Sequence, residues 1–251
     1  MDNYFVNRKT IRSFSDEKVG DELVHSLLGI ASHAPTTGNM QLYSVVATRD
    51  EEKKKKLAEC HFNQPASVSA PLILTFCADF NRFEKWCNSR NAIPGFRNFQ
   101  SFMSAVIDTV CVAQQFNTVA EMYGLGCCYL GTVTYNAPQI SSLLKLPEMV
   151  VPVVSLAVGF PLDAESQPSS DRLPVGHLLH IEEYVDYTSE DIDNCYAYKE
   201  SLPESAKFIS ENNKETLAQV FTDVRYPESN NTIFSDIYYR FIEEKGFQFP
   251  K

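Results

Sequence analysis

Hydrophobic residues recur at helical spacing soon after the N-terminus of this chain. Leu23, Leu27, Ile30 and Ala31 share one face, which predicts a helix that begins after Gly20. The next residues, "APTTGNMQ" at 34–41, break the pattern with proline and glycine and predict a loop.

The longest helical pattern runs from about residue 98 to residue 123, and Gly124 is expected to end it. Its apolar residues extend around much of the helix surface, so we expect this helix to lie centrally in the fold. They are Phe102, Val106, Val110, Ala113, Phe116, Val119 and Met122.

Continuous apolar runs, rather than alternating ones, predict buried strands at 70–80 and 150–161. Shorter strands are predicted at 44–49 and 127–133, and further helices at 50–59 and 137–146.

Three stretches lack a clear period. Residues 82–97 contain Pro94 and Gly95 and are expected to be irregular. The polar stretch 163–174 is either a domain linker or a functional loop that crosses a surface. The tail from residue 187 shows only helical patches.

Composition narrows the class of protein. The 251 residues are enough for one large domain or two small ones, and 44% of them are hydrophobic. A net charge of -10 argues against an extended basic face for nucleic acid. No apolar stretch has the length of a signal peptide or a membrane span, and no pair among the seven cysteines has C-x-x-C spacing. We therefore expect a cytoplasmic protein with reduced thiols.

Positive charge is concentrated in "NRKTIRSF" at residues 7–14, although the chain as a whole is acidic. Arg8, Lys9 and Arg12 lie beside the hydroxyls of Thr10 and Ser13. Such a cluster suits a small anion, and a solvated N-terminal arm is the alternative.

Familiar catalytic motifs are absent from the sequence. It contains no G-x-S-x-G elbow and no P-loop, and "GLGCCYLG" precedes a predicted strand where a dinucleotide fingerprint should follow one. His177 and His180 lack a third metal ligand, so surface or core histidines are favoured over a metal site. Cys127 and Cys128 are expected on opposite faces of a strand rather than as a redox pair.

Several segments together resemble the nitroreductase family of FMN-dependent oxidoreductases, and most closely its larger NADPH-type nitroreductase and flavin reductase branch. "RKTIRSF" resembles the family's R-S-I-R-x-F opening, and "APTTGNMQ" resembles A-P-S-S-x-N-x-Q. "CADFNR" at 77–82 and the region from "GLGCCYLGTVTYN" to "LAVGFP" are similar to the same branch, and "DRLP" is similar to its K-P-R-L-P.

The resemblance implies an α+β fold with three α/β/α layers around a central mixed, mainly antiparallel sheet. It implies one nitroreductase-like FMN-binding domain over 1–251, in which 163–251 form an extended loop and a C-terminal excursion. It also implies a homodimer with FMN at the subunit interface, in which the C-terminal segment wraps the partner.

The same resemblance assigns a cofactor site without a catalytic side chain, because the flavin carries the chemistry. It places phosphate contacts in the N-terminal segment and the 170–172 loop, flavin-edge contacts at Thr36 and Gln64, and ring contacts at residues 129–132. The residues are Arg8, Lys9, Thr10, Arg12, Thr36, Gln64, Tyr129, Leu130, Gly131, Thr132, Ser170 and Arg172. Ser170 stands where the family often has a lysine, so one cation beside the phosphate is lost and FMN is expected to bind less tightly. Lys9 replaces the usual first arginine, which keeps the charge and loses the forked geometry of the guanidinium.

The implied activity is hydride transfer from NAD(P)H, through flavin N5, to nitroaromatics, quinones or free flavin by a ping-pong mechanism. Alternatives are a dedicated reaction on the same fold, such as dehalogenation or azoline oxidation, and a non-catalytic FMN-binding module. Lys214 and Arg225 are candidates for the 2′-phosphate of NADPH, and solvated surface charges are the competing interpretation. No metal is predicted.

Overall fold

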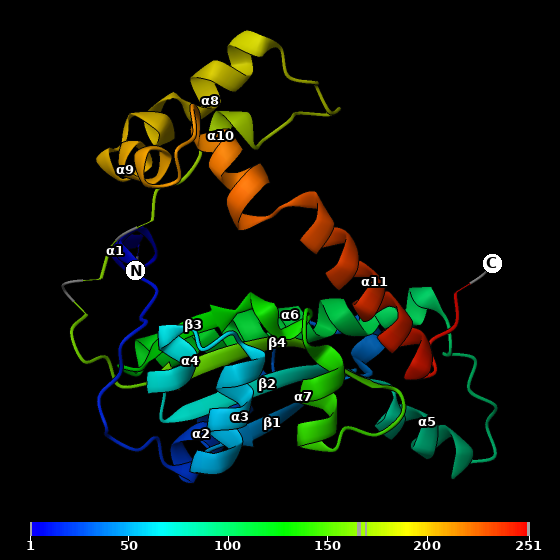
Figure 1. The fold of residues 1–251 in the computed structure, drawn as a ribbon. Helices are drawn as coiled ribbons and strands as arrows, with labels where there is room; N and C mark the ends of the chain where they lie inside the picture. The colour runs from blue at the N-terminus through cyan, green and yellow to red at the C-terminus, as the bar shows by residue number, and fades with distance from the viewer. Residues whose placement is uncertain (1, 165–166, 169, 250–251) are drawn as a thin grey trace. The chain divides into compact units, whose positions relative to one another are not determined.

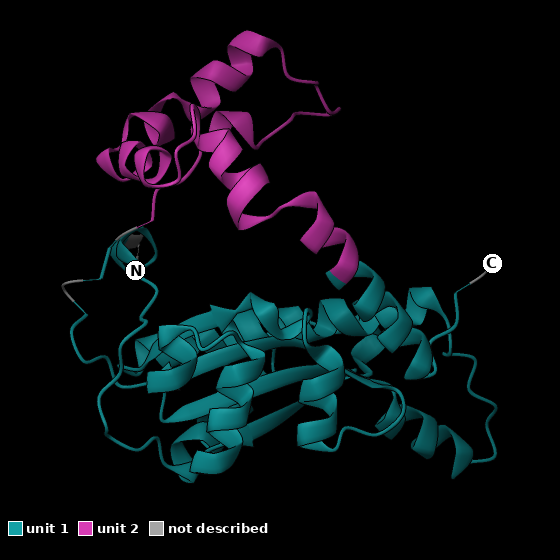
Figure 2. Cartoon of the chain, in the orientation of Figure 1, with its two compact units in different colours: residues 1–168, 234–251 teal, residues 169–233 magenta. Residues whose placement is uncertain are grey.

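The structure is a computed structural model that describes residues 2–164, 167–168 and 170–249. The chain divides into two compact units, which Figure 2 colours separately. Unit 1 comprises residues 1–168 and 234–251, and unit 2 comprises residues 169–233. The boundary between the units falls inside the polar stretch 163–174.

Unit 1 contains a four-stranded antiparallel sheet in the order β1-β2-β4-β3. The strands are β1 (Tyr43–Thr48), β2 (Leu72–Asp79), β3 (Gly126–Leu130) and β4 (Val150–Gly159). A register shift lies between Phe76 and Cys77, which pair with Val154 and Pro152 and so leave Val153 as the extra residue. Proline cannot donate to a regular ladder and is found at such irregularities. The sheet was expected to be mixed and mainly antiparallel; among the described residues the only parallel pairing is an isolated bridge between Asn98 and Gln248.

Helices cover both faces of this sheet (Figure 1). Leu72, Leu74 and Phe76 of β2 pack with α2 (Asp21–Ala31) and α6 (Phe99–Met122). The intervening Ile73 packs on the opposite face, with α3 (Glu51–Cys60) and α7 (Ala137–Leu144). This alternation follows from the two-residue period of a strand and produces the expected three layers.

A second apolar cluster joins the first half of α6 to the end of the chain. Phe102 and Ala105 of α6 pack with Phe241 and Ile242 of α11 (Glu228–Glu244) and with Phe247. The helix α11 begins in unit 2, and its residues from 234 onward belong to unit 1.

The segment after α1 (Asp2–Asn7) lies against the sheet because two glycines leave room for it. A Cβ on Gly126 would lie 2.6 Å from Ile11, and one on Gly159 would lie 2.6 Å from Pro71 and 3.0 Å from Phe14. Gly126 and Gly159 face each other in the register of β3 and β4. These glycines therefore allow close packing of the chain at this end of the sheet.

Most predicted elements agree with the structure, but the expectation for residues 82–97 was wrong. The helix α5 (Asn81–Asn88) occupies the first half of that stretch. Phe83 and Trp86 lie at helical spacing and their rings contact at 5.3 Å. The prediction gave too much weight to Pro94 and Gly95, which interrupt only the residues after the helix. Two short helices, α1 and α4 (Pro65–Ser69), were not predicted.

Unit 2 is helical. It contains η3 (Val175–His177), α8 (Ser189–Ser201), α9 (Pro203–Glu211), α10 (Leu217–Gln219) and η4 (Val220–Arg225). Capping boxes at Thr188 and Thr216 begin α8 and α10. The segment from 175 to 185 exposes several large apolar side chains, among them Leu178, Leu179 and Ile181. Among the described residues, no helix combines the length and the apolar character that crossing a membrane would require.

Candidate functional site

The basic N-terminal segment lies beside β3. The backbone N–H of Ile11 donates to the carbonyl of Cys127 (3.2 Å), and Ser15 N–H donates to Phe160 (2.9 Å). This pairing places residues 8–12 along the strand that leads to Gly131. Cys127 and Cys128 belong to different apolar clusters, which confirms that they point to opposite faces of the strand.

Arg8 is held by a buried carboxylate that the sequence did not indicate. Its Nη2 lies 2.8 Å from Oε1 of Glu121, a residue of α6 whose side chain is only 8% exposed. Asn117 Nδ2 donates to the same Oε1 (3.0 Å), and the Tyr4 hydroxyl donates to Oε2 (2.6 Å). Burial, and then Glu121, raise the pKa of Tyr4 above its ordinary value. Glu121 therefore fixes the orientation of the Arg8 guanidinium.

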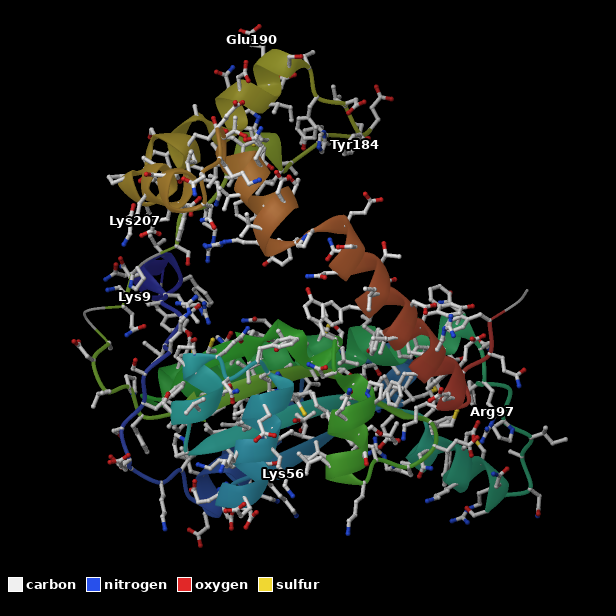
Figure 3. All side chains as sticks on the ribbon, viewed as in Figure 1. Lys9, Lys56, Arg97, Tyr184, Glu190 and Lys207 are labelled. Carbon is white, nitrogen blue, oxygen red and sulfur yellow. The ribbon has the colours of Figure 1, made fainter. Side chains whose placement is uncertain are left out.

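Arg12 presents a different environment. Its side chain is exposed, and within the described parts of the chain its guanidinium has no hydrogen bond or ion pair. Its backbone carbonyl accepts a hydrogen bond from Ser69 Oγ (3.3 Å), which joins the N-terminal segment to the end of α4. Lys9 lies on the same segment (Figure 3) and, with Arg8, lines an open hollow of about 400 Å³. Thr10 is half-buried beside them.

Gln64 is the N-cap of α4, at the opposite end of that helix from Ser69. Its backbone N–H donates to the carbonyl of His61 (3.2 Å) across a tight turn. Phe62 and Asn63 within the turn have φ values of 54° and 52°, in the left-handed region. This conformation is strained for residues other than glycine, so the turn is held by its surroundings.

The segment η2 (Gly131–Val133) follows β3 and connects back to the same turn. Thr132 Oγ1 lies 2.9 Å from Nδ1 of His61. His61 is completely buried, and burial lowers its pKa to about 4. A Cβ on Gly131 would meet no atom within 4 Å, so the backbone at Gly131 can be approached closely.

Tyr129 and Leu130 alternate at the end of β3. Leu130 is buried in the cluster that contains Ile11 and Phe14. Tyr129 is half-buried, and its hydroxyl donates to Gln114 Oε1 of α6 (3.3 Å). Burial raises the pKa of Tyr129 above its ordinary value. Tyr129 and Leu130, two of the four residues predicted to line the ring, therefore face opposite sides of the strand.

The loop that contains Thr36 is anchored to α6 at Asp108, nearer the start of the helix than Asn117 and Glu121. The backbone N–H of Thr37 donates to Asp108 Oδ1 (2.8 Å), and that of Leu42 donates to Asp108 Oδ2 (3.1 Å). Asp108 precedes Asn117 by nine residues of α6, which is about 13 Å at 1.5 Å per residue. Thr36 therefore belongs to a group of contacts distinct from that of Arg8.

Four predicted residues lie in unit 2. Ser170 and Arg172 are exposed, and Arg172 Nη1 donates to the carbonyls of Ser170 (3.3 Å) and Asp171 (2.8 Å). Lys214 forms an ion pair with Asp223 (2.9 Å), and the Arg225 guanidinium lies 4.5 Å from the centroid of the Phe208 ring. That Arg172 joins the N-terminal cations, and that Lys214 and Arg225 contact a nicotinamide phosphate, stay predictions.

The structure thus brings three sequence-distant segments of unit 1 into one continuous chain of contacts: 8–12, 61–69 and 127–132. Sequence reasoning missed the residues that join and orient them. They are Tyr4, His61, Asp108, Asn117 and Glu121. The one available signal was that Asp108 and Glu121 are the two charged residues of a helix whose other side chains carry no charge.

The two histidines of unit 2 have polar and aromatic neighbours. His180 stacks on Tyr184 at 4.3 Å between centroids, and the carbonyl of His177 accepts from the Tyr187 hydroxyl (2.6 Å). In the part of the chain that the structure describes, no three His, Cys, Asp or Glu side chains are grouped so that they could hold a metal ion. All seven cysteines are free thiols.

Comparison with known proteins gives a consistent result. The family model described as Nitroreductase family matches residues 6–160. A Bacillus subtilis (strain 168) protein named FMN reductase NAD(P)H is 29% identical over 257 residues, covering 98% of this chain and 96% of the relative. A crystal structure of a protein from Bacteroides fragilis NCTC 9343 has a TM-score of 0.95 at 51% identity, covering 98% of this chain and 99% of the other. The NfrA1 nitroreductase from B. subtilis has a TM-score of 0.84 at 26% identity, with 98% of each chain covered.

Proposed function

The chain belongs to the nitroreductase family, and on that premise we propose that it is an FMN-dependent oxidoreductase that uses NAD(P)H to reduce small oxidants. The acceptors are nitroaromatics, quinones or free flavin. The names of the relatives, which include an FMN reductase of B. subtilis, support this assignment.

One observation carries the proposal: segments 8–12, 61–69 and 127–132 form a continuous chain of contacts that combines free positive charge with accessible backbone. Arg12 is exposed, and its guanidinium forms no hydrogen bond or ion pair with the residues that the structure describes. Gly131 leaves its backbone open, since a Cβ there would meet nothing within 4 Å. A phosphate needs the first feature and a planar ring needs the second, so the residues fit FMN.

The residues divide between the two ends of the cofactor. Arg12, Lys9 and Thr10 would hold the phosphate end, and Arg8 would be presented by its ion pair with Glu121 (2.8 Å). Gln64, Gly131 and Thr132 would border the ring. The bound flavin supplies the hydride-transfer chemistry.

We propose that the enzyme is a homodimer with FMN at the subunit interface and with the C-terminal excursion wrapped around the partner. The apolar side chains of unit 2 support this arrangement, because Leu178, Leu179 and Ile181 are each at least 60% exposed. Exposed apolar residues in this number are typical of a surface that binds another protein. Sedimentation of the FMN-loaded protein as a monomer would contradict the arrangement.

The test of the proposed function is the visible spectrum of the purified protein, before and after anaerobic addition of NADPH. We expect a yellow protein whose flavin absorbance is lost on NADPH addition and returns when menadione is added. Parallel double-reciprocal plots are expected, since one flavin face serves both substrates. A protein that neither carries nor binds FMN would refute the proposal, and one that binds FMN without reduction by NADPH or NADH would be a binding module.

A further inference from the structure

His61 contacts two residues of the proposed flavin site at once. Its backbone carbonyl accepts the N–H of Gln64 (3.2 Å), and its Nδ1 lies 2.9 Å from Thr132 Oγ1. The imidazole is fully buried, so these contacts are made in the protein interior. His61 thus connects the turn before α4 to the turn after β3.

The turn that follows His61 is braced from the side of residues 135–136. Phe62 and Asn63 are both in the left-handed region, which is strained above all for a bulky residue such as Phe62. The Phe62 ring packs against Tyr135 at 6.5 Å between centroids, and Asn136 Nδ2 donates to the carbonyl of Cys60 (2.6 Å). These contacts hold His61 in one place relative to Thr132.

The surroundings of the imidazole indicate which of its nitrogens carries the hydrogen. Nε2 is buried without a hydrogen-bond partner among the described residues. A buried N–H without an acceptor is rarer in proteins than a buried acceptor without a donor. The hydrogen is therefore assigned to Nδ1, which donates it to Thr132 Oγ1. The hydroxyl of Thr132 is then free to donate its own hydrogen elsewhere.

We propose that His61 is a positioning residue that turns the hydroxyl hydrogen of Thr132 toward the flavin ring, so that the site binds reduced FMN more tightly than it would without this contact. The inference rests on the proposed function. A reduced flavin carries more negative charge than an oxidised one, and a fixed donor at the edge of the ring stabilises that charge.

Four variants test the proposal: Thr132→Val, His61→Leu, His61→Asn and the double variant Thr132→Val/His61→Leu. The dissociation constants of oxidised and of chemically reduced FMN are measured anaerobically for each. We expect Thr132→Val and His61→Leu each to weaken binding of reduced FMN about tenfold more than binding of oxidised FMN. This factor corresponds to a potential about 30 mV lower for a two-electron couple. His61→Asn retains a donor near the position of Nδ1. Its ratio of the two dissociation constants should therefore be closer to that of the wild type than to that of His61→Leu.

The double variant should weaken binding of reduced FMN, relative to oxidised FMN, by no more than one single variant does, because both changes remove the same hydrogen bond. Thr118→Val is a matched control, since the Thr118 hydroxyl donates within its own helix to Gln114 O (3.1 Å). An unchanged ratio of the two dissociation constants in Thr132→Val would overturn the inference, whether or not His61→Leu folds. Wild-type protein that binds neither form of FMN would instead refute the proposed function.

Discussion

Acidification should destabilise this protein through His61, and the size of the effect follows from its burial. The fold favours the neutral imidazole, because burial lowers the pKa of His61 to about 4 from an ordinary value of 6.5. The unfolded chain binds the proton first, so the stabilisation is complete above pH 6.5 and is lost as the pH falls toward 4.

Between pH 7.5 and pH 5.0 the expected loss from this one group is about 2 kcal/mol. The lower value lies about 1.5 pH units below the unfolded pKa, and each unit is worth about 1.36 kcal/mol. Because pH 5.0 is still above the pKa of His61 in the folded state, the size of this loss depends mainly on the pKa of His61 in the unfolded state.

The assay is urea unfolding followed by far-ultraviolet circular dichroism at the two pH values. His61→Asn removes the titrating group and keeps a side chain that can donate to Thr132. Carboxylates contribute equally to both proteins, so the wild type should lose about 2 kcal/mol more than the variant. His33→Asn is the matched control, since His33 is exposed and its replacement should leave the wild-type loss unchanged. Equal losses in wild type and His61→Asn would refute the reasoning.

Three further predictions concern the N-terminal segment and unit 2. Gly126→Ala should destabilise the protein by about 1–3 kcal/mol, because the new Cβ would lie 2.6 Å from Ile11. Adding Ile11→Ala should relieve part of this cost. Thermal melts of the two single variants and of the double variant measure both effects. Arg12→Ala should weaken FMN binding by about 1.5–3 kcal/mol in a fluorescence titration. The control Arg90→Ala, at another exposed arginine, should leave the affinity unchanged. An unchanged affinity in Arg12→Ala would contradict a contact between Arg12 and the phosphate. The preference for NADPH over NADH in kcat/KM should stay within roughly tenfold and shrink at high salt, because Lys214 already pairs with Asp223 at 2.9 Å; a thousandfold preference would contradict it.

The sequence predicts the elements of this fold best where a pattern is long and local. The helix Phe99–Met122 and the strands Leu72–Asp79 and Val150–Gly159 agree with the expected ranges to within a few residues. Each has an apolar run that only one kind of element buries well. The helix Asn81–Asn88 was missed because its apolar stripe is short and lies next to a proline and a glycine.

The site was less predictable because its joining contacts are long-range. The ion pair between Arg8 and Glu121 and the contact between His61 and Thr132 connect residues that no local period relates. The charge of Arg8 was visible in the sequence, but its buried partner was not. A side chain's availability to a ligand depends on such partners, so residue type alone overstates the number of free cations.

The packing of residues 8–15 against β3 and β4 also has a consequence for how the chain folds during synthesis. Ile11 pairs with Cys127, and Ser15 pairs with Phe160, so these two residues need partners that are translated more than a hundred residues later. The β3 strand is at the edge of the sheet, and Ile11 N–H occupies one of its carbonyls. On a ribosome the nascent N-terminal segment therefore has to wait without its native contacts, and the finished edge stays open to pairing with other chains until that segment docks.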